Sequence, residues 1–211
     1  AVVVRFGGGE EVTRCLRSLL AHGPDRVVLV DSGSEDGGAD EHARRFPEIE
    51  VIALEVNRSF AFAVRQGAAR CAGDDLLLLN PDTELTEGAY ERLHRGLVSR
   101  PGAAGTVPLL YGPDGRAQHR WQLRRLPSAR RLAGGRAGRP AFRRPPQRAV
   151  PVPQPAAAAW LVRRRVWDAL DGLDPAFAPA WWEDVDFCAR LEAARADGVV
   201  GAEARFIVVP D

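Results

Sequence analysis

The residues best suited to chemistry form an acidic corner at the end of an apolar run. Four leucines at 76–79 are followed by Asn80-Pro81-Asp82, and Glu84 lies two positions further on. Such a run predicts a strand buried on both faces within a parallel sheet, and Pro81 ends its ladder because it has no N–H to donate. Open α/β sheets bind ligands at the carboxyl ends of their strands. A carboxylate there suits a hard divalent cation that is shared with a phosphate-bearing substrate.

A second acidic cluster, Glu183, Asp184 and Asp186, directly follows Trp181 and Trp182. Acids in a first helical turn are ordinary partners of the helix dipole, and on a helix Glu183 and Asp186 share a face that Asp184 does not. Large aromatic side chains beside carboxylates are common where sugars or other flat groups stack. A carboxylate in such a semi-apolar place could serve as a general base.

Two polar loops follow the second and third apolar runs of the chain. In Asp31-Ser32-Gly33, small residues let a ligand approach the backbone, and the carboxylate can accept hydrogen bonds from a base edge or from ribose hydroxyls. Asn57-Arg58 could line a nucleotide pocket, with Arg58 offering a fork of donors. Each loop also has a purely structural interpretation as a turn or helix cap, so both interpretations stay open.

The elements that must position these residues alternate along the first half of the chain. Apolar runs predict strands at 1–6, 27–30, 51–54, 76–79 and 103–110, and helical spacing predicts helices at 10–21, 35–46, 59–71 and 87–99. We expect Ser34 to cap the helix at 35–46. Strand and helix in alternation predict right-handed βαβ units and a parallel sheet.

The second half begins with a different composition. Between 111 and 155, Pro, Gly and Arg dominate, and the lack of periodicity predicts a long irregular segment with at most short helices. Regular structure is expected to resume with a strand at 157–163, a short helix at 164–170, a helix from Trp181 to about residue 196, and one or two strands within 199–209.

Charge is distributed unevenly over the 211 residues. All 29 basic residues are Arg, and 14 of them lie between Gly115 and Trp167, a stretch without Asp or Glu. The rest of the chain contains the other 15 arginines and all 28 acidic residues. The net charge of +1 therefore combines a basic insert with an acidic body. The insert could contact phosphates, an anionic membrane or a nucleic acid. Its only interleaved aromatic residues are Trp121 and Phe142, which disfavours nucleic-acid binding.

Several other classes are disfavoured by simple patterns. The three cysteines form no C-x-x-C pair, so we expect buried reduced thiols rather than a zinc site or disulfides. No apolar stretch is long enough to span a bilayer, and no signal peptide is visible. The four histidines lack metal-ligand spacing and are expected at the surface. Gly7-Gly8-Gly9 lacks the third glycine of a dinucleotide fingerprint, since Val12 occupies that position. No serine elbow or Cys–His pair predicts a covalent nucleophile.

In this order the motifs resemble a known family. The ordered motifs are Val30 to Gly37, Asn57 to Ala61, Leu78 to Glu84 and Trp182 to Phe187. Together they resemble the family 2 glycosyltransferases with the GT-A fold, and within them the rhamnosyltransferase-like branch. The resemblance covers nearly the whole chain. It implies a three-layer α/β/α fold with a mostly parallel central sheet. It also implies one GT-A domain over residues 1–211, made of a nucleotide-binding half (1–110), the Arg/Pro-rich irregular insert (111–155) and an acceptor-side half (156–211).

The resemblance also implies roles for individual residues. The residues implied to bind the nucleotide sugar are Asp31, Ser32, Gly33, Asn57, Arg58, Asn80 and Asp82, with Asp31 on the base. Asp82 would hold Mg²⁺ or Mn²⁺ against the donor diphosphate. Asp184 would deprotonate the acceptor hydroxyl, while Glu183 shapes the acceptor site.

The implied activity is an inverting transfer of a hexose or deoxyhexose, rhamnose-like, from a dTDP- or UDP-sugar to a polysaccharide or lipid-linked glycan. A cytoplasmic location is expected, with the arginine insert as a route to peripheral contact at the inner face of the membrane. The chain departs from the family at Arg5-Phe6-Gly7, where members usually have Asn-Tyr-Asn, and 206–211 contains no His. The alternative is therefore a degenerate GT-A domain that binds a nucleotide sugar or a partner without catalysis.

Overall fold

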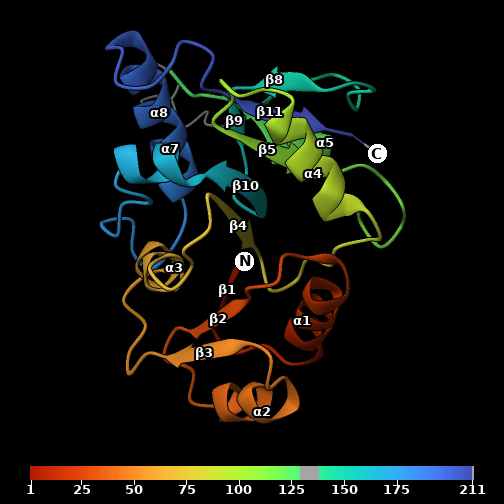
Figure 1. Ribbon diagram of the computed structural model, residues 1–211, viewed down its shortest axis with the longest axis vertical. Coiled ribbons are helices and arrows are strands. Elements are labelled where there is room, and N and C mark those ends of the chain that lie inside the picture. Colours follow the sequence, from red (N-terminus) through yellow and green to blue (C-terminus); the bar gives the residue numbers. More distant parts are fainter. Residues whose placement is uncertain (129–137, 211) are drawn as a thin grey trace.

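An eight-stranded sheet runs through the centre of the protein (Figure 1). The computed structural model describes residues 1–128 and 138–210. In spatial order the strands are β3 (Glu50–Ala53), β2 (Val28–Asp31), β1 (Val2–Arg5), β4 (Asp75–Leu79), β10 (Ala159–Arg163), β5 (Gly105–Pro108), β11 (Phe206–Val209) and β8 (Val150–Val152). The expected strands of the first half are all present, with ends that differ by a few residues.

The leucine strand β4 lies in the interior of this sheet, and Leu76 to Leu79 are all buried. Its neighbour β1 is parallel, as expected, but its other neighbour β10 is antiparallel. The β3, β2, β1 and β4 strands are mutually parallel, and so are β5 and β11. The sheet is therefore mixed but mostly parallel. The first four strands end at one edge, where Arg5 of β1 pairs in register with Asp31 of β2.

Helices cover both faces of the sheet, because alternate residues of each strand are apolar on opposite sides (Figure 1). On one face, α3 (Phe60–Ala68), α7 (Arg164–Ala169) and α8 (Glu183–Ala196) pack against the side of the sheet that includes Val2 and Val4. On the other, α1 (Glu10–His22) and α4 (Ala89–Val98) pack against the side that includes Val3. The predicted three-layer α/β/α architecture with a mostly parallel central sheet is confirmed.

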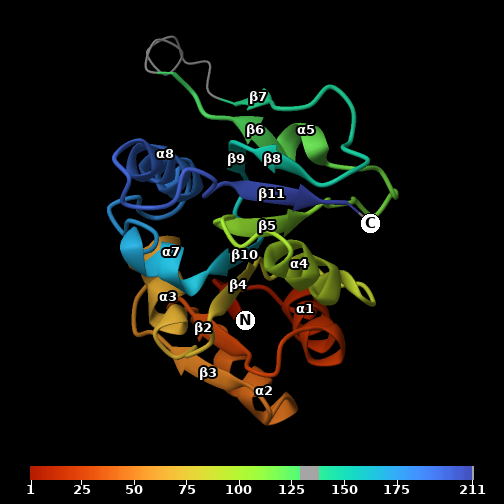
Figure 2. The same ribbon diagram turned by 45° about the horizontal axis from the view of Figure 1, so that its top comes forward.

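The insert at 111–155 contains more structure than its composition predicts. After the short helix α5 (His119–Gln122), a small antiparallel sheet forms from β7 (Arg139–Pro140), β6 (Leu123–Arg125) and β9 (Gln154–Pro155). It lies beside the β8 edge of the main sheet (Figure 2). The expectation of an irregular segment with at most short helices was wrong for these strands and for β8, which belongs to the same segment. Residues 129–137 lie outside the described part.

Smaller expectations also needed correction. The second helix, α2 (Gly38–Arg45), begins after a left-handed Gly37, and Ser34 does not cap it. Instead the Ser34 hydroxyl accepts a hydrogen bond from the backbone N–H of Gly7. The prediction of surface histidines was wrong for His42 and His119, which are buried.

Other expectations were met within the described residues. All three cysteines are free and buried. No helix in 1–128 or 138–210 has the length and apolar character that a membrane crossing requires.

Candidate active site

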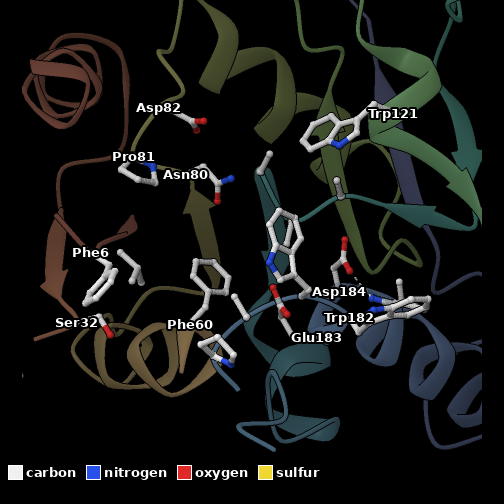
Figure 3. A pocket seen from close by; sticks show the side chains of 18 of the residues that line it. Phe6, Ser32, Phe60, Asn80, Pro81, Asp82, Trp121, Trp182, Glu183 and Asp184 are labelled. Carbon is white, nitrogen blue, oxygen red and sulfur yellow. Dashed lines mark hydrogen bonds between the residues drawn. The ribbon is translucent and has the colours of Figure 1, made fainter. Parts of the chain in front are cut away.

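A cavity of about 930 Å³ opens at the edge where β1, β2 and β4 end. Its volume is in the range of small-molecule sites, about 300–1,000 Å³. Figure 3 shows Phe6 and Ser32 at one end, Asn80 in the middle, and Trp121 and Asp184 at the other end. The cavity thus joins residues that lie far apart in the sequence, and both predicted acidic corners contribute to it.

The first end of the cavity combines an aromatic ring with two polar side chains. Phe6 lines it with 66% of its surface exposed, although an aromatic residue of this size is usually buried. Ser32 and Asn57 line it from two different loops, and the Ser32 hydroxyl donates to Asn57 Oδ1 at 3.0 Å. These loops were predicted to bind a nucleoside, and the structure brings Ser32 and Asn57 together.

Asp31 is not among the residues that line the cavity. Its carboxylate is buried and forms an ion pair with the fully buried guanidinium of Arg5, while its Oδ1 accepts from the backbone N–H of Ser34 at 2.7 Å. Arg5 is also bound to Asp36 Oδ2 at 2.6 Å and to the carbonyl oxygen of Gly8 at 3.2 Å. The resemblance assigns Asp31 to the nucleotide base, but in the structure its carboxylate is bound to Arg5 and to the backbone N–H of Ser34.

Gly33 and Arg58 also lie outside the cavity wall. Gly33 has a φ of +76°, and a Cβ there would lie 2.6 Å from the backbone nitrogen of Asn57, so this glycine allows the two loops to pack closely. The Arg58 guanidinium stacks on the ring of Phe62, 4.9 Å from its centroid. Gly33 thus has a packing role between the two loops, and Arg58 contacts Phe62 of α3.

Asn80 and Asp82 line the middle of the cavity from the turn that follows β4. The turn is held by the Asn80 N–H, which donates to Ala158 O at 2.9 Å, and by the Thr83 N–H, which donates to Asn80 O at 3.1 Å. Beneath it, burial and then the charges of Asp82 and Glu84 raise the pKa of the Cys15 thiol to about 12. Cys15 therefore stays protonated and unreactive under this turn.

The fit of a divalent cation depends on Asp82. Its carboxylate is exposed, while Glu84 forms an ion pair with Arg14 at 2.9 Å and does not line the cavity. Within the described residues, no group of three or more His, Cys, Asp or Glu could hold a metal ion. Mg²⁺ is commonly bound through one or two carboxylates plus substrate phosphates. Asp82 therefore fits as one ligand of a divalent cation whose other ligands come from a diphosphate. The described residues do not by themselves form a complete metal-binding site.

Glu183 lies on the wall of the acidic end and is 8% exposed. Its Oε2 is buried and has no hydrogen-bond partner among the described residues. Burial, with a smaller contribution from the charge of Asp184, raises the pKa of this carboxyl above its ordinary value, and the backbone N–H groups of Glu183 and Trp181 oppose the shift. This carboxylate retains the capacity to accept a proton.

The chain reaches α8 through a strained turn. Trp181 and Trp182 have φ angles of 83° and 76°, in the left-handed region that bulky residues rarely adopt. Both rings line the cavity, and Trp181 is 76% exposed. Such strain costs on the order of 1–3 kcal/mol per residue and clusters at functional sites. Here it presents two large aromatic faces beside Glu183.

Asp184 is bonded quite differently from its neighbour. Its Oδ2 accepts from Arg124 Nη2 and from Gln154 Nε2, each at 3.0 Å. The backbone N–H groups of Val185 and Ala157 also stabilise the carboxylate, although burial is the largest effect and raises its pKa. A carboxylate offers about four acceptor positions, so protein donors fill those of Asp184. Asp186 is not among the residues that line the cavity, and its carboxylate pairs with Arg190 at 2.7 Å.

Several residues of this site were missed from the sequence. Arg124 and Gln154 reach Asp184 from β6 and β9, two short strands without any detectable alternation. The position of Arg5 at the end of an apolar run, opposite Asp31 at the end of the next run, was a usable signal. In a parallel pair these two residues are neighbours, and buried opposite charges pair.

The basic insert presents much of its charge to solvent. Its exposed arginines, within the described residues, are Arg116, Arg120, Arg125, Arg139, Arg143, Arg144 and Arg148. Trp121, 49% exposed, lies in the same segment and lines the cavity. The segment that carries these exposed arginines therefore also contributes a residue, Trp121, to the wall of the cavity.

The sequence and the fold both match known proteins. Residues 1–170 match the family model for Glycosyl transferase family 2. The chain is 27% identical, over 217 aligned residues, to N-acetylglucosaminyl-diphospho-decaprenol L-rhamnosyltransferase of Mycobacterium tuberculosis, covering 92% of this chain and 70% of that protein.

Solved structures share the fold at lower identity. The crystal structure of GalNAc-T7 with UDP, GalNAc and Mn²⁺ superposes with a TM-score of 0.71 at 16% identity, over 99% of this chain and 41% of that one. S. aureus TarS 1-349 superposes with a TM-score of 0.67, also at 16% identity, over 100% of this chain and 57% of that one. The chain therefore spans less than two thirds of the length of these solved chains.

Proposed function

This chain belongs to glycosyl transferase family 2, and we propose that it transfers a hexose or deoxyhexose, such as rhamnose, from a UDP- or dTDP-linked donor. The acceptor would be a hydroxyl of a polysaccharide or of a lipid-linked glycan, and the transfer a single inverting displacement at the anomeric carbon. One observation carries the proposal: Ser32 and Asn57, Asp82, and the pair Glu183 and Asp184 all line a single cavity.

The order of groups along the cavity matches the order of groups in a nucleotide sugar. The ring of Phe6 and the polar pair Ser32–Asn57 suit a nucleoside. Asp82 lies further along, where a diphosphate would follow. The aromatic and acidic end suits the sugar and the incoming acceptor hydroxyl.

Asp82 is the residue proposed to hold Mg²⁺ or Mn²⁺ together with the donor diphosphate. When bound, the ion would neutralise the charge that develops on the departing nucleoside diphosphate. Asn80, on the same turn, would orient the donor. The structure of GalNAc-T7, which shares the fold, contains both UDP and Mn²⁺, and this supports a joint role of the ion and the diphosphate.

Proton acceptance is proposed for the acidic pair. The resemblance assigns it to Asp184, with Glu183 shaping the acceptor site. The hydrogen bonds favour Glu183 as the proton acceptor. Asp184 Oδ2 already accepts from Arg124 and Gln154. Glu183 Oε2 has no hydrogen-bond partner among the described residues.

The exposed arginines of the insert support an anionic acceptor environment. We propose that they contact the phosphates of a lipid-linked acceptor or an anionic leaflet, which implies a peripheral position at the cytoplasmic face of a membrane. The relative from M. tuberculosis is named for a diphospho-decaprenol-linked acceptor, which is consistent with this proposal.

A non-catalytic, nucleotide-sugar-binding domain is the second candidate. The occupied Asp31 favours it, because this acid is withdrawn from the position that the resemblance gives it. The two candidate functions differ in one respect: a transferase cleaves the bound nucleotide sugar, whereas a binding domain does not.

Release of nucleoside diphosphate from a panel of UDP- and dTDP-sugars, with and without Mn²⁺, tests the proposal. A transferase should hydrolyse its own donor slowly even without an acceptor. The Asp82→Asn variant should lose the Mn²⁺-dependent release. Glu84→Gln is the matched control, since this nearby acid is outside the cavity and paired with Arg14. Donor binding without any release would favour the second candidate.

A further inference from the structure

We infer that Ser18 of α1 is a positioning residue, which holds the turn that carries Asp82 in place for the divalent cation and the donor diphosphate. The turn spans residues 80–85, and its Asn80 and Asp82 side chains line the cavity (Figure 3). Ser18 is not among the residues of the cavity wall, so it acts on Asp82 only through the backbone of the turn. The inference rests on the proposed function, because it concerns the support of the same metal-binding carboxylate.

The turn is fixed where it begins. The Asn80 N–H donates to Ala158 O at 2.9 Å, and the Asn80 carbonyl oxygen accepts from the Thr83 N–H at 3.1 Å. From α1, the Cys15 thiol donates to the same carbonyl oxygen at 3.5 Å. Burial raises the pKa of this thiol to about 12, so its hydrogen stays available for this weak hydrogen bond. The first residue of the turn is therefore attached both to the chain just before β10 and to α1.

Ser18 fixes the end of the turn. Its hydroxyl oxygen accepts from the Leu85 N–H at 2.9 Å, and the same hydroxyl donates to Cys15 O at 2.7 Å. The Leu85 side chain is 7% exposed and belongs to the same buried cluster as Leu16 and Leu19 of α1. Without the Ser18 hydroxyl, the Leu85 N–H would lose its acceptor in a largely buried place, which is unfavourable. The last residue of the turn would then be held by its side chain alone.

Between these two anchors, Asp82 is exposed and depends on the backbone for its position. The hydrogen bond that its carboxylate accepts from the Thr83 hydroxyl is long, at 3.5 Å, and therefore weak. Pro81 restricts φ at one residue of the turn, and the anchors at Asn80 and Leu85 restrict the rest. A binding group must be held within about 0.5 Å of its productive geometry. Loss of one anchor would widen the range of positions that the Asp82 carboxylate can adopt.

A second contact between α1 and the turn allows a comparison. Arg14 Nε lies 2.9 Å from Glu84 Oε1, but the two side chains are 49% and 52% exposed. Exposed ion pairs of this kind contribute little, because water screens them and two long side chains must be ordered. We therefore expect the pair of Arg14 and Glu84 to be dispensable for the position of Asp82, in contrast to the Ser18 hydroxyl.

The ratio of the UDP affinities with and without Mn²⁺, measured by calorimetric titration, tests the inference. This ratio reports the metal-dependent part of binding, because contacts with the nucleoside and overall stability are common to both titrations. Ser18→Ala retains the helix, since Ala has the highest helix propensity, and should lower the ratio about tenfold, the order expected for residues that support a metal ligand. Ser18→Thr keeps a hydroxyl in the same place and should restore most of the ratio. Hydrogen exchange of the Leu85 amide should be faster in Ser18→Ala and slow again in Ser18→Thr.

Two control variants complete the design. Thr106→Val removes another hydroxyl that joins two elements, since Thr106 of β5 donates to Leu93 O of α4 at 3.0 Å, and Thr106 does not line the cavity. This variant should lower thermal stability and leave the UDP ratio unchanged. Arg14→Gln breaks the exposed contact between α1 and the turn, and should also leave the ratio unchanged.

The outcomes separate the inference from the proposed function. An unchanged ratio in Ser18→Ala would overturn the inference and leave the transferase proposal intact. An equal fall in Ser18→Ala and Thr106→Val would also overturn it, because the effect would then be one of general stability. If the unaltered protein binds UDP equally well with and without Mn²⁺, the proposed role of Asp82 fails, and the inference fails with it. Failure to bind UDP under either condition would refute the proposed function itself.

Discussion

Arg124 Nη2 lies 3.0 Å from Asp184 Oδ2, which links the small sheet of the insert to the helix that carries the acidic pair. The side chains are 25% and 12% exposed, so this ion pair is only partly screened by water. Gln154 makes a second link to the same oxygen from β9. The small sheet is thus joined to α8 through Asp184, which lines the candidate active site.

Replacing Arg124 should therefore affect both stability and activity. Arg124→Gln would leave the buried Asp184 without its cation, and we expect the free energy of unfolding to fall by about 1–3 kcal/mol. Donor turnover should fall as well, because β6 would lose its anchor beside the cavity. Urea unfolding and nucleoside diphosphate release measure the two effects. Arg125→Gln is the control, since Arg125 is the exposed neighbour on the same strand and should tolerate the change.

The two acids of the pair should behave differently when neutralised. Glu183→Gln should lower turnover by about 10²–10⁴-fold, the usual contribution of a general base, while UDP binding is retained. Asp184→Asn should retain more turnover but lower the melting temperature, because it disturbs the links to Arg124 and Gln154. The reverse pattern, with near-normal Glu183→Gln and inactive Asp184→Asn, would return the base role to Asp184.

Glu183 also predicts a dependence on pH. Burial raises the pKa of its carboxyl above the ordinary 4.5, so between 4.5 and the raised value the folded protein holds a proton that the unfolded chain has lost. This contribution to stability is complete below pH 4.5 and is lost as the pH rises through the raised pKa. Urea unfolding across this range should show the unaltered protein losing stability relative to Glu183→Gln. Turnover should rise over the same interval, because the base must be ionised. If the stability difference between the unaltered protein and Glu183→Gln does not change with pH, the raised pKa does not belong to Glu183.

The pair formed by Arg5 and Asp31 should be a major contribution to stability. Arg5→Leu would leave Asp31 buried without its cation, and a loss of about 3–5 kcal/mol is expected. The double variant Arg5→Leu/Asp31→Asn should recover part of that loss, because it removes both charges together. Chemical denaturation of the single and double variants gives the coupling directly. Strictly additive effects would mean that the two side chains do not interact.

Much of the scaffold could be predicted because its signals are local. The strands at the start of the chain are short apolar runs, and the helices between them have regular apolar spacing. The turn at Asn80-Pro81-Asp82 follows from a buried strand that meets a proline. These signals were sufficient to expect Asp82 at the carboxyl end of a central strand, whereas the place of Glu183 and Asp184 in the same site was implied only by the family resemblance.

The remaining features depend on contacts that local patterns do not encode. The β6, β7 and β9 strands are only two or three residues long and contain Pro140 and Pro155, so no alternation is detectable. The contacts of Arg124 and Gln154 with Asp184 follow from those strands and were missed with them. The role expected for Asp31 came from a motif alone, while its actual partner, Arg5, lies 26 residues earlier in the chain.

The order of the strands has a consequence for synthesis. On one side β5 pairs with β11, with Gly105 in register with Phe206, and on the other side it pairs with β10. Both partners follow β5 in the chain, so both are synthesised after it. While the ribosome is still translating the insert, β5 therefore has no permanent partner on either side. An unpaired apolar strand of this kind invites association with other chains. Slower translation of the segment between β10 and β11 would lengthen the interval during which one side of β5 is unpaired.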